Sequence, residues 1–546
     1  MKEKVAIIGM GCVFPGALDF TEYWQNIVEG KGCIREVEPV FWKLEEFYDP
    51  DPSVPDKSYC KMGGQSGPIE FDTKEWGISP KVMEHTAVDQ LFGLVVARQA
   101  LIDAGYYGPN ARPFDRENTG VIMSAGTGSH VFNLHSRTQR FNIRKILVNN
   151  GVPEAAADMM IEKYLDTLQE WSEDDNPGYI PNVVAGRIAN RFDLGGTSCS
   201  VDAACGASLG AVKFAVDELV SGNMDMMLVG GANLDNSPVT YLSFTKTPAS
   251  SKTGTIRPFD EKADGMIIGD GVGIMVLKRL SDAERDGDKI YAVICGTGSS
   301  SDGRAKSIYA PSPEGQIRAL KRAYKNSGVD MDTIGLLEAH GTGTAAGDAC
   351  EVTSAVTAFP RSDKRKTVLG SVKSQVGHMR LAAGIAGCMK VALALHHKVL
   401  PNSINFETPT PVLVDSRLTV LKKSQPWIVN DAQPVRRAGA SAFGFGGTNF
   451  HVVLEEYQSE HDTAYRVGPT PMGVLFTAGS KAALMEKLRV LAGDPGQFRT
   501  DMYRFANAGD GQFRLALVAK TPDEAAQKCA AALVLLNMKT DDAFTQ

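Results

Sequence analysis

The stretch TSCSVDAACGASL (residues 197–209) decides the fold of this chain, because a strand turns into a helix within it. The residues before Cys205 are typical of a short buried strand, and residues 206–219 place apolar side chains at helical spacing. Small residues crowd the junction, so the chain can turn sharply there. Cys205 then lies at a helix N-terminus, whose partial positive charge favours the reactive thiolate. The alternative is a small buried cysteine that merely begins a helix, and this stretch alone favours neither interpretation.

Composition limits the class of protein. The chain has 546 residues, of which 43% are hydrophobic and 22% charged, as is usual for a water-soluble globular protein with more than one domain. No apolar run is long enough to cross a membrane, and the apolar stretch after Met1 is too short for a secretory signal. Nine scattered cysteines without a CxxC pair favour reduced thiols in the cytoplasm over disulfides or a zinc site, so we expect no metal. The net charge of −7 argues against nucleic acid as a partner.

The order of strand-like segments restarts in the middle of the chain. Residues 290–296 repeat the pattern of residues 5–11, and residues 335–344 repeat that of residues 120–128, since both of the latter run from a strand into Gly-Thr-Gly. Two further pairs are 367–372 with 226–230, and 438–454 with 266–280. We therefore expect an α/β fold of two duplicated halves, about 1–285 and 288–455, with mostly parallel strands covered by helices. Residues 131–178 are charged, have helical spacing, and are expected to form an inserted cap.

The second half supplies candidate partners for Cys205. His340 and His378 each follow an apolar strand, where a side chain can reach a cleft. Lys373 precedes His378 by five residues and is a possible charge partner for Glu351 or Asp348. Backbone N–H groups of the glycine-rich turn 444–449 could face an oxyanion. Taken singly, the histidines could be structural, the lysine solvated and the turn an ordinary hairpin.

Together and in this order, four motifs closely resemble the β-ketoacyl synthases of the thiolase-like superfamily. They are DAAC (202–205), EAHGTGTAAGD (338–348), GSVKSQVGH (370–378) and GFGGTN (444–449). The resemblance covers residues 5 to about 455 and implies a thiolase-like fold in αβαβα layers, with a synthase domain at 1–456. It is greatest for type I megasynthases, and segments such as SFTKTP (243–248) indicate the polyunsaturated-fatty-acid branch.

The resemblance also implies a reaction. Cys205 takes an acyl group from a phosphopantetheine thioester on an acyl carrier protein, and a malonyl unit loses CO2 and condenses with it. No bound cofactor is expected. His340 and His378 would stabilise the enolate, and the backbone N–H groups of Cys205 and Phe445 the tetrahedral oxyanion. The remaining matched residues are Phe445 and Gly446 for oxyanion binding and gating, Thr342 and Thr344 for the phosphopantetheine arm, Lys373 as an electrostatic group acting through Glu351, and Asp348 and Glu338 as structural support.

Some positions depart from the family pattern, and others argue against related families. Phe450 stands where a small residue is common, and Gly387 where some stand-alone synthases carry an acid. Cys199 is expected to be buried and inert. A thiolase would need a cysteine where Phe445 stands, and a loading-type decarboxylase a glutamine where Cys205 stands. The main alternative is a catalytically silent partner subunit of the chain-length-factor kind, which would be expected to lack the cysteine.

Beyond residue 456 the composition changes. Residues 457–546 are expected to contain two strands and two helices, and they resemble the small α+β linker domain between the ketosynthase and acyltransferase of megasynthases. We expect a piece of a longer polypeptide, a homodimer, and an acyl carrier protein that is acidic and binds a basic surface. Residues 137–145 and 361–366 are the candidate basic stretches. Neither a membrane nor nucleic acid is expected as a partner.

Overall fold

The computed structural model describes residues 3–127, 131–304, 307–308, 310–359, 366–414, 416–429, 433–458, 472–495, 513–519 and 521–538. Its strands are β1 (Val5–Val13), β2 (Ile34–Glu36), β3 (Met62–Gly64), β4 (Thr119–Ser124), β5 (Ser198–Val201), β6 (Met226–Asn233), β7 (Ile268–Gly269), β8 (Gly271–Arg279), β9 (Ala292–Ser301), β10 (Leu336–Glu338), β11 (Thr367–Gly370), β12 (Val399–Leu400), β13 (Leu418–Thr419), β14 (Gln425–Pro426), β15 (Arg437–Gly444), β16 (Thr448–Glu455), β17 (Met472–Ala478) and β18 (Phe513–Ala519).

The helices alternate with these strands. They are α1 (Phe20–Glu29), α2 (Leu44–Phe47), α3 (Thr73–Trp76), α4 (Pro80–Glu84), α5 (Val88–Asp103), α6 (Val131–Thr138), α7 (Arg140–Asn149), α8 (Glu154–Leu165), α9 (Asp175–Tyr179), α10 (Asn182–Phe192), α11 (Ala207–Ser221), α12 (Pro238–Lys246), α13 (Leu280–Arg285), α14 (Pro313–Ser327), α15 (Ala345–Ala358), α16 (Lys373–Val376), α17 (Ala383–His397), α18 (Lys481–Gly493) and α20 (Pro522–Met538), with 3₁₀ turns η1 (Met331–Thr333) and η2 (Arg380–Ala382).

One large sheet joins the two halves of the chain. Its strand order is β13-β11-β10-β15-β16-β9-β1-β8-β6-β4-β5, and the halves meet where β1 pairs antiparallel with β9. Counted outward from this junction, β1-β8-β6-β4-β5 on one side is matched by β9-β16-β15-β10-β11 on the other. The predicted duplication is therefore confirmed.

Two of the predicted repeat pairs are wrong in detail. By its place in the sheet, β11 corresponds to β5 and not to residues 226–230, whose counterpart is β15. Likewise β16 is the counterpart of β8, so the hairpin 438–454 repeats two strands that are separated by a long excursion in the first half. The error arises because short apolar strands look alike in sequence, whereas their edge or central position depends on pairing. This correspondence bears on the site, because Cys205 follows β5 and His378 follows β11, the equivalent strand of the second half.

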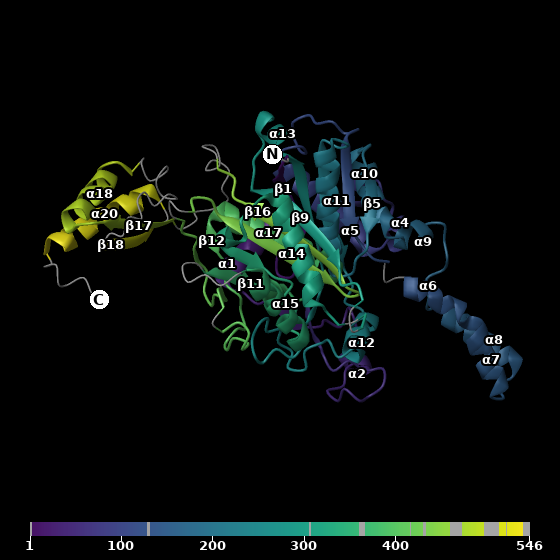
Figure 1. The fold of residues 1–546 in the computed structure, drawn as a ribbon. Helices are drawn as coiled ribbons and strands as arrows, with labels where there is room; N and C mark the ends of the chain where they lie inside the picture. The colour runs from purple at the N-terminus through teal and green to yellow at the C-terminus, as the bar shows by residue number, and fades with distance from the viewer. Residues whose placement is uncertain are drawn as a thin grey trace.

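The layers follow the predicted αβαβα order (Figure 1). Helices α11 and α17 pack against each other and against strands of both halves, so they form the middle layer. All residues of α17 are buried, and apart from Lys390 and the two histidines at its end the helix is apolar, as is typical of a buried helix. Helices α5 and α10 cover the outer face of the first half, and α14 lies against β9 and β16 on the second.

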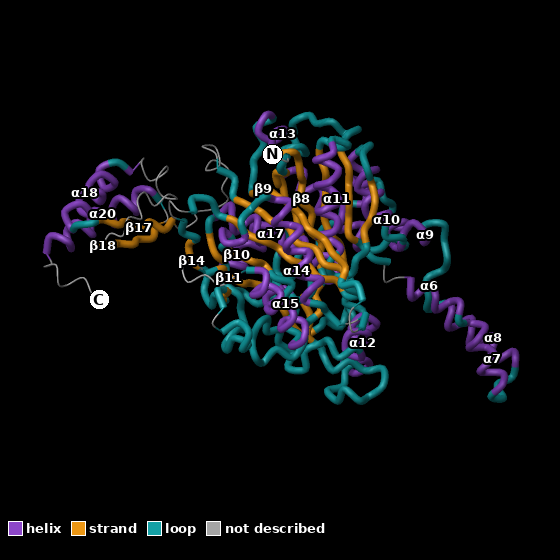
Figure 2. The backbone as a smooth tube through the Cα atoms, in the orientation of Figure 1, coloured by secondary structure: helices purple, strands orange, loops and turns teal. Residues whose placement is uncertain are grey.

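Two segments stand apart from this body (Figures 1 and 2). The predicted cap is helical, but α7 and α8 pack on each other and project outward, and Phe141 and Ile146 are exposed, so these helices do not cover the body. At the other end, β17 and β18 pair antiparallel and pack with α18 and α20, which confirms the small α+β unit. Among the described residues, no helix combines the length and apolarity needed to cross a membrane.

Candidate active site

Cys205 stands on a strained turn between β5 and α11. Ala204 has φ +49°, in the left-handed region that residues other than glycine seldom adopt. The Asp202 carboxylate accepts the Ala204 N–H at 2.9 Å and holds this turn. The thiol thus projects at the start of a 15-residue helix, as the predicted elbow requires.

His340 lies in the loop that follows β10. The backbone N–H groups of His340 and Gly341 donate to the two carboxylate oxygens of Glu351, each at 2.7 Å. The Lys373 ammonium donates to the His340 carbonyl at 2.6 Å. The loop is therefore fixed from both sides, by an anion on α15 and a cation on α16.

His378 has a defined tautomer. Its Nδ1 accepts the backbone N–H of Arg380 at 3.1 Å, so in the neutral ring the proton is on Nε2. Arg380 reaches this geometry because its φ is +48°. Burial, reinforced by the positive charges of Lys373 and Arg380, moves the pKa of His378 well below its usual value, which keeps the ring neutral. His378 therefore offers an N–H donor.

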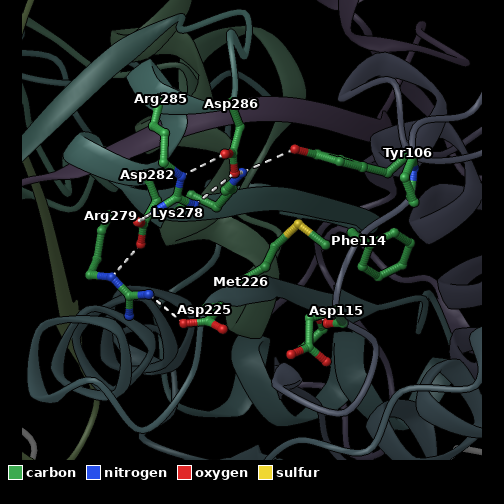
Figure 3. Close-up of a pocket in the computed structure, with 12 residues that line it drawn as sticks. Tyr106, Phe114, Asp115, Asp225, Met226, Lys278, Arg279, Asp282, Arg285 and Asp286 are labelled. Carbon is green, nitrogen blue, oxygen red and sulfur yellow. Dashed lines mark hydrogen bonds and ion pairs between the residues drawn. The ribbon is translucent and has the colours of Figure 1, made fainter.

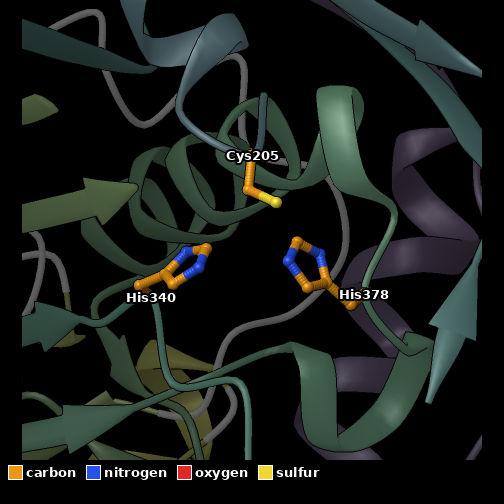
Figure 4. A group of neighbouring side chains, drawn as sticks. All are labelled: Cys205, His340 and His378. Atoms are coloured by element: carbon orange, nitrogen blue, oxygen red, sulfur yellow. The ribbon is translucent and has the colours of Figure 1, made fainter. Parts of the chain in front are cut away.

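The thiol and the two imidazoles converge (Figure 4). The Sγ atom of Cys205 and one ring nitrogen each of His340 and His378 all lie within 4.8 Å of one another, and the two rings are edge to face with centroids 5.3 Å apart. Such a trio could hold a metal ion, but a metal-bound histidine normally donates its second ring nitrogen to an oxygen acceptor. His378 instead accepts there, so this arrangement favours hydrogen-bond donation over ligation.

The electrostatics of the site oppose charge on each of the three groups. Burial raises the pKa of the Cys205 thiol, while the charge of Lys373 and the backbone N–H groups of Phe445 and Cys205 lower it in part. Burial, with Lys373 and His378 nearby, also moves the pKa of His340 well below its usual value.

A buried network of charges surrounds Lys373. Burial lowers the pKa of Lys373, and the charge of Glu338 is the main opposing influence. Glu338 accepts the Val372 N–H at 2.6 Å and forms an ion pair with Lys390, also at 2.6 Å. Asp348 accepts the Phe259 and Gly343 N–H groups, and burial raises its pKa to about 7.

Lys373 contacts the His340 loop directly as well as acting on Glu351. The sequence predicts that it orders the site through Glu351, yet its ammonium donates a hydrogen bond to the His340 carbonyl, while Glu351 binds the same loop through the N–H groups. Both groups thus hold the His340 loop, and their charges also interact, since Glu351 raises the pKa of Lys373 and Lys373 lowers that of Glu351. Burial raises the pKa of Glu351.

The remaining predicted residues lie around the thiol and the histidines. Thr342 and Thr344 are half-buried, and their hydroxyls are 2.9 Å apart. Phe445 is 57% exposed in the turn between β15 and β16, where Gly446 has φ +98°. Phe450 on β16 packs against Gly206 and Gly210 of the elbow helix, where a Cβ atom would come within 3.1 Å of its ring.

Three other expectations can be compared with the structure. Cys199 is half-buried on the edge strand β5, so the prediction that it is buried is wrong. Arg137 donates to the carbonyls of Leu165 and Leu168, and Arg144 forms ion pairs with Glu154 and Asp158, so part of the first basic stretch is used internally. Residues 361–365 of the second stretch lie outside the described residues.

Two residues near the histidines were missed. Arg380 sits two positions after His378, and its side chain donates to Asn233 and to the Asp235 carbonyl. Lys390 is fully buried in α17. A lone lysine in an otherwise apolar helix was a signal for Lys390, whereas nothing local marks the left-handed backbone of Arg380.

A separate cavity of about 270 Å³ lies near α13 (Figure 3). Lys278 bonds there to Asp286, Asp288 and Tyr106, and Arg279 pairs with Asp225 and Asp282. Lys278 and Arg279 are thus both paired with carboxylates, whereas the Cys205 site brings together a thiol and two imidazoles.

Comparison with known proteins agrees with this geometry. Residues 2–283 match the N-terminal domain of β-ketoacyl synthases, residues 291–407 the C-terminal domain, and residues 408–502 the ketoacyl-synthetase C-terminal extension. The chain belongs to the β-ketoacyl synthase family, whose members are acyltransferases that form carbon–carbon bonds.

Its relatives are domains of very large synthases. The chain is 41% identical over 502 residues to one of the subunits of the polyunsaturated fatty acid synthase of Thraustochytrium, covering 90% of this chain and 18% of that protein. It is 35% identical to polyketide synthase PksN of Bacillus subtilis, covering 90% of this chain and 9% of that protein. The chain thus spans less than a fifth of these relatives and is a ketosynthase domain of the type that they contain.

Solved structures give the same assignment. An oxazolomycin ketosynthase domain of Streptomyces albus matches with a TM-score of 0.73 and 29% identity, over 99% of this chain and 89% of that chain. A PfaC ketosynthase–chain length factor protein also matches with a TM-score of 0.73, at 31% identity over 89% of this chain and 52% of that chain. The thiolase-like fold predicted from the motifs is confirmed.

Proposed function

We propose that Cys205 is the nucleophile of a decarboxylative condensation. The thiolate attacks the carbonyl of an acyl thioester, a new C–S bond forms, and the bond to the phosphopantetheine sulfur breaks. That sulfur leaves as a thiol with the proton lost by Cys205. The N–H groups of Cys205 and Phe445 would stabilise the tetrahedral oxyanion, because both favour negative charge on the Cys205 side chain and lower its pKa.

The second half-reaction uses the histidines. A malonyl thioester loses CO2 by cleavage of a C–C bond, and the negative charge passes to the thioester oxygen as an enolate. His378 Nε2–H and the His340 ring would donate hydrogen bonds to that oxygen. The enolate carbon then attacks the acyl carbonyl on Cys205, a C–C bond forms, and the C–S bond breaks to release the β-ketoacyl product. The convergence of one thiol with two neutral imidazoles is the observation that carries this proposal.

The other predicted residues take supporting roles. Lys373 and Glu351 hold the His340 loop, Asp348 holds the loop at Gly343, and Glu338 holds the backbone at Val372. The hydroxyls of Thr342 and Thr344 would bind the phosphopantetheine arm. Phe445 and Gly446 would form the gate, since the turn that carries them combines an exposed ring with a left-handed glycine.

The substrates would arrive on an acyl carrier protein, with no permanently bound cofactor. In this proposal residues 1–456 form the synthase domain and residues 457–546 the linker that leads to further domains such as an acyltransferase, within a cytoplasmic polyketide or polyunsaturated fatty acid synthase. The chain covers only a small fraction of each relative, which supports the proposal that it works together with further domains.

A homodimer is part of the same proposal. Strand β5 ends the large sheet, so one of its edges has no partner strand within the described chain. An unpaired edge is suited to pairing with a second copy. Sedimentation equilibrium should give twice the 58.7 kDa mass of one chain, and a monomer at micromolar concentration would overturn this part.

Mass spectrometry of the intact protein tests the chemistry. Incubation with acyl-pantetheine thioesters should add one acyl group to the wild-type protein and none to Cys205→Ala. An adduct that persists in Cys205→Ala would move the nucleophile elsewhere, with half-buried Cys199 as the first suspect. A folded wild-type protein without any adduct would favour the silent partner subunit, the alternative to which the ketosynthase–chain length factor neighbour draws attention.

A further inference from the structure

The outer face of α14 concentrates positive charge. Arg318, Lys321, Arg322 and Lys325 are all exposed, and their spacing of three, four and seven residues places them on one side of the helix. At 1.5 Å per residue this row is about 10 Å long. We call these four residues the α14 basic face.

None of the four side chains of the α14 basic face forms an ion pair with a described carboxylate, although the charge of Arg318 lowers the pKa of Glu314 one turn earlier. Among the residues that the structure describes, no carboxylate lies within ion-pair distance of these four cations, and Glu314, the acid of this helix, accepts the hydroxyl of Ser312. On neighbouring α15 the exposed residues include Ala349, Thr353 and Thr357, which carry no charge. The chain as a whole has a net charge of −7, so this row of four exposed cations is opposite in sign to the molecule as a whole.

The α14 basic face begins beside the turn that contacts Cys205. The Arg318 guanidinium donates to the Ser301 carbonyl at 2.7 Å, and the next residue, Asp302, donates its N–H to the Gly447 carbonyl at 2.8 Å. Gly447 belongs to the same turn as Phe445, whose backbone N–H lowers the pKa of the Cys205 thiol. Gly315 at the start of α14 also packs directly against Asp302 and Asn449.

We propose that the α14 basic face is the docking surface for the acidic carrier protein that delivers the acyl group. This inference rests on the proposed function and adds the location of the partner. Exposed charges of opposite sign steer association and fix orientation more than they add affinity, so contacts here would act mainly on capture of the carrier. A carrier bound at the start of α14 would stand next to the turn through which its arm must pass.

The test separates docking from chemistry. Lys321→Glu/Lys325→Glu reverses two charges whose side chains form no described hydrogen bond, so the contacts of Arg318 and Arg322 with β9 stay intact. The probe is a purified acidic acyl carrier protein loaded with hexanoyl-phosphopantetheine, compared with free hexanoyl-pantetheine. We expect the KM for the loaded carrier to rise about tenfold at low salt, and the difference to shrink at about 0.5 M salt, because added ions screen exposed charges. Acylation by free hexanoyl-pantetheine should be unchanged.

A matched control reverses two exposed cations elsewhere. Arg140→Glu/Lys145→Glu on α7 changes the same number of charges in the basic stretch that the sequence suggested. An unchanged KM in the α14 variant, or a rise confined to the α7 variant, would overturn the proposal. If wild type is acylated by none of the acyl-pantetheine thioesters, the proposed function fails instead, and fluorescence anisotropy of the labelled carrier still decides the docking question. Equal binding of the carrier to wild type and the α14 variant would then refute it.

Discussion

The ion pair between Lys390 and Glu338 makes the sharpest stability prediction. The two side chains are 0% and 2% exposed, and Nζ and Oε2 are 2.6 Å apart. Lys390→Met keeps the volume of the side chain and leaves the Glu338 carboxylate buried without its cation. Removal of one partner from a buried pair costs about 3–5 kcal/mol, because the remaining charge stays desolvated.

The double variant separates the charge from the packing. Lys390→Met with Glu338→Gln removes both charges, and the introduced amide retains an oxygen that can accept the Val372 N–H. Neutral replacement of a buried pair often costs little, so we expect the double variant to be at least about 2 kcal/mol more stable than Lys390→Met alone. The measurement is urea unfolding of the wild type, both single variants and the double variant.

A surface pair serves as the control. Lys213 and Asp217 lie on α11, one turn apart, with side chains 25% and 56% exposed. Lys213→Met should change the free energy of unfolding by less than about 0.5 kcal/mol. If Lys390→Met also stays within about 1 kcal/mol of wild type, or if the double variant is no more stable than the single one, the reasoning about the buried charge is refuted.

Three further outcomes follow from the site. Because burial raises the pKa of Cys205, its alkylation by iodoacetamide should continue to accelerate as the pH rises above the usual thiol pKa of about 8.5. Lys373→Met should be alkylated more slowly than wild type at a pH of about 8, because the positive charge that lowers the pKa of Cys205 is gone. Faster alkylation of Lys373→Met would contradict this role of Lys373. His340→Ala and His378→Ala should retain acylation of Cys205 within a few-fold while malonyl decarboxylation falls about 10²-fold or more, measured by release of labelled CO2; parallel loss of both steps would argue against enolate stabilisation. Gly210→Ala should raise helix stability by about 1 kcal/mol in a Phe450→Ala background and by less in the wild-type background, where the new methyl meets the Phe450 ring; equal effects in urea unfolding would show that the ring moves aside freely.

Local patterns in the sequence predicted much of the fold. Apolar strands that end in glycines predicted β1, β4, β9 and β10, and their repetition predicted two halves. The elbow at Cys205 was visible because small residues and a helical apolar pattern meet there. These features depend on neighbours in the chain, which is why they can be read without knowing the packing.

Other features depended on which segments lie side by side. Residues 367–370 look like any short apolar strand, and only pairing with β10 and β13 makes them the counterpart of β5. The apolar pattern around Lys390 marked it in the sequence, but only the packing of α17 showed that its partner is Glu338, far earlier in the chain. The tautomer of His378 depends on the backbone N–H of Arg380, whose left-handed φ has no local signal in the sequence.

The sequence by itself therefore determined the duplicated α/β fold, and it identified the thiol, the two histidines and the lysine that we propose as reacting and supporting groups. Tertiary structure decided how those groups are held: His340 between Glu351 and Lys373, His378 by a backbone N–H, and the α14 basic face beside the turn at Phe445. The physical reason is the distance along the chain over which each interaction acts. Hydrogen-bonding periodicity acts over a few residues and leaves a trace in sequence, whereas desolvation and ion pairing act between segments that only the packed core brings together.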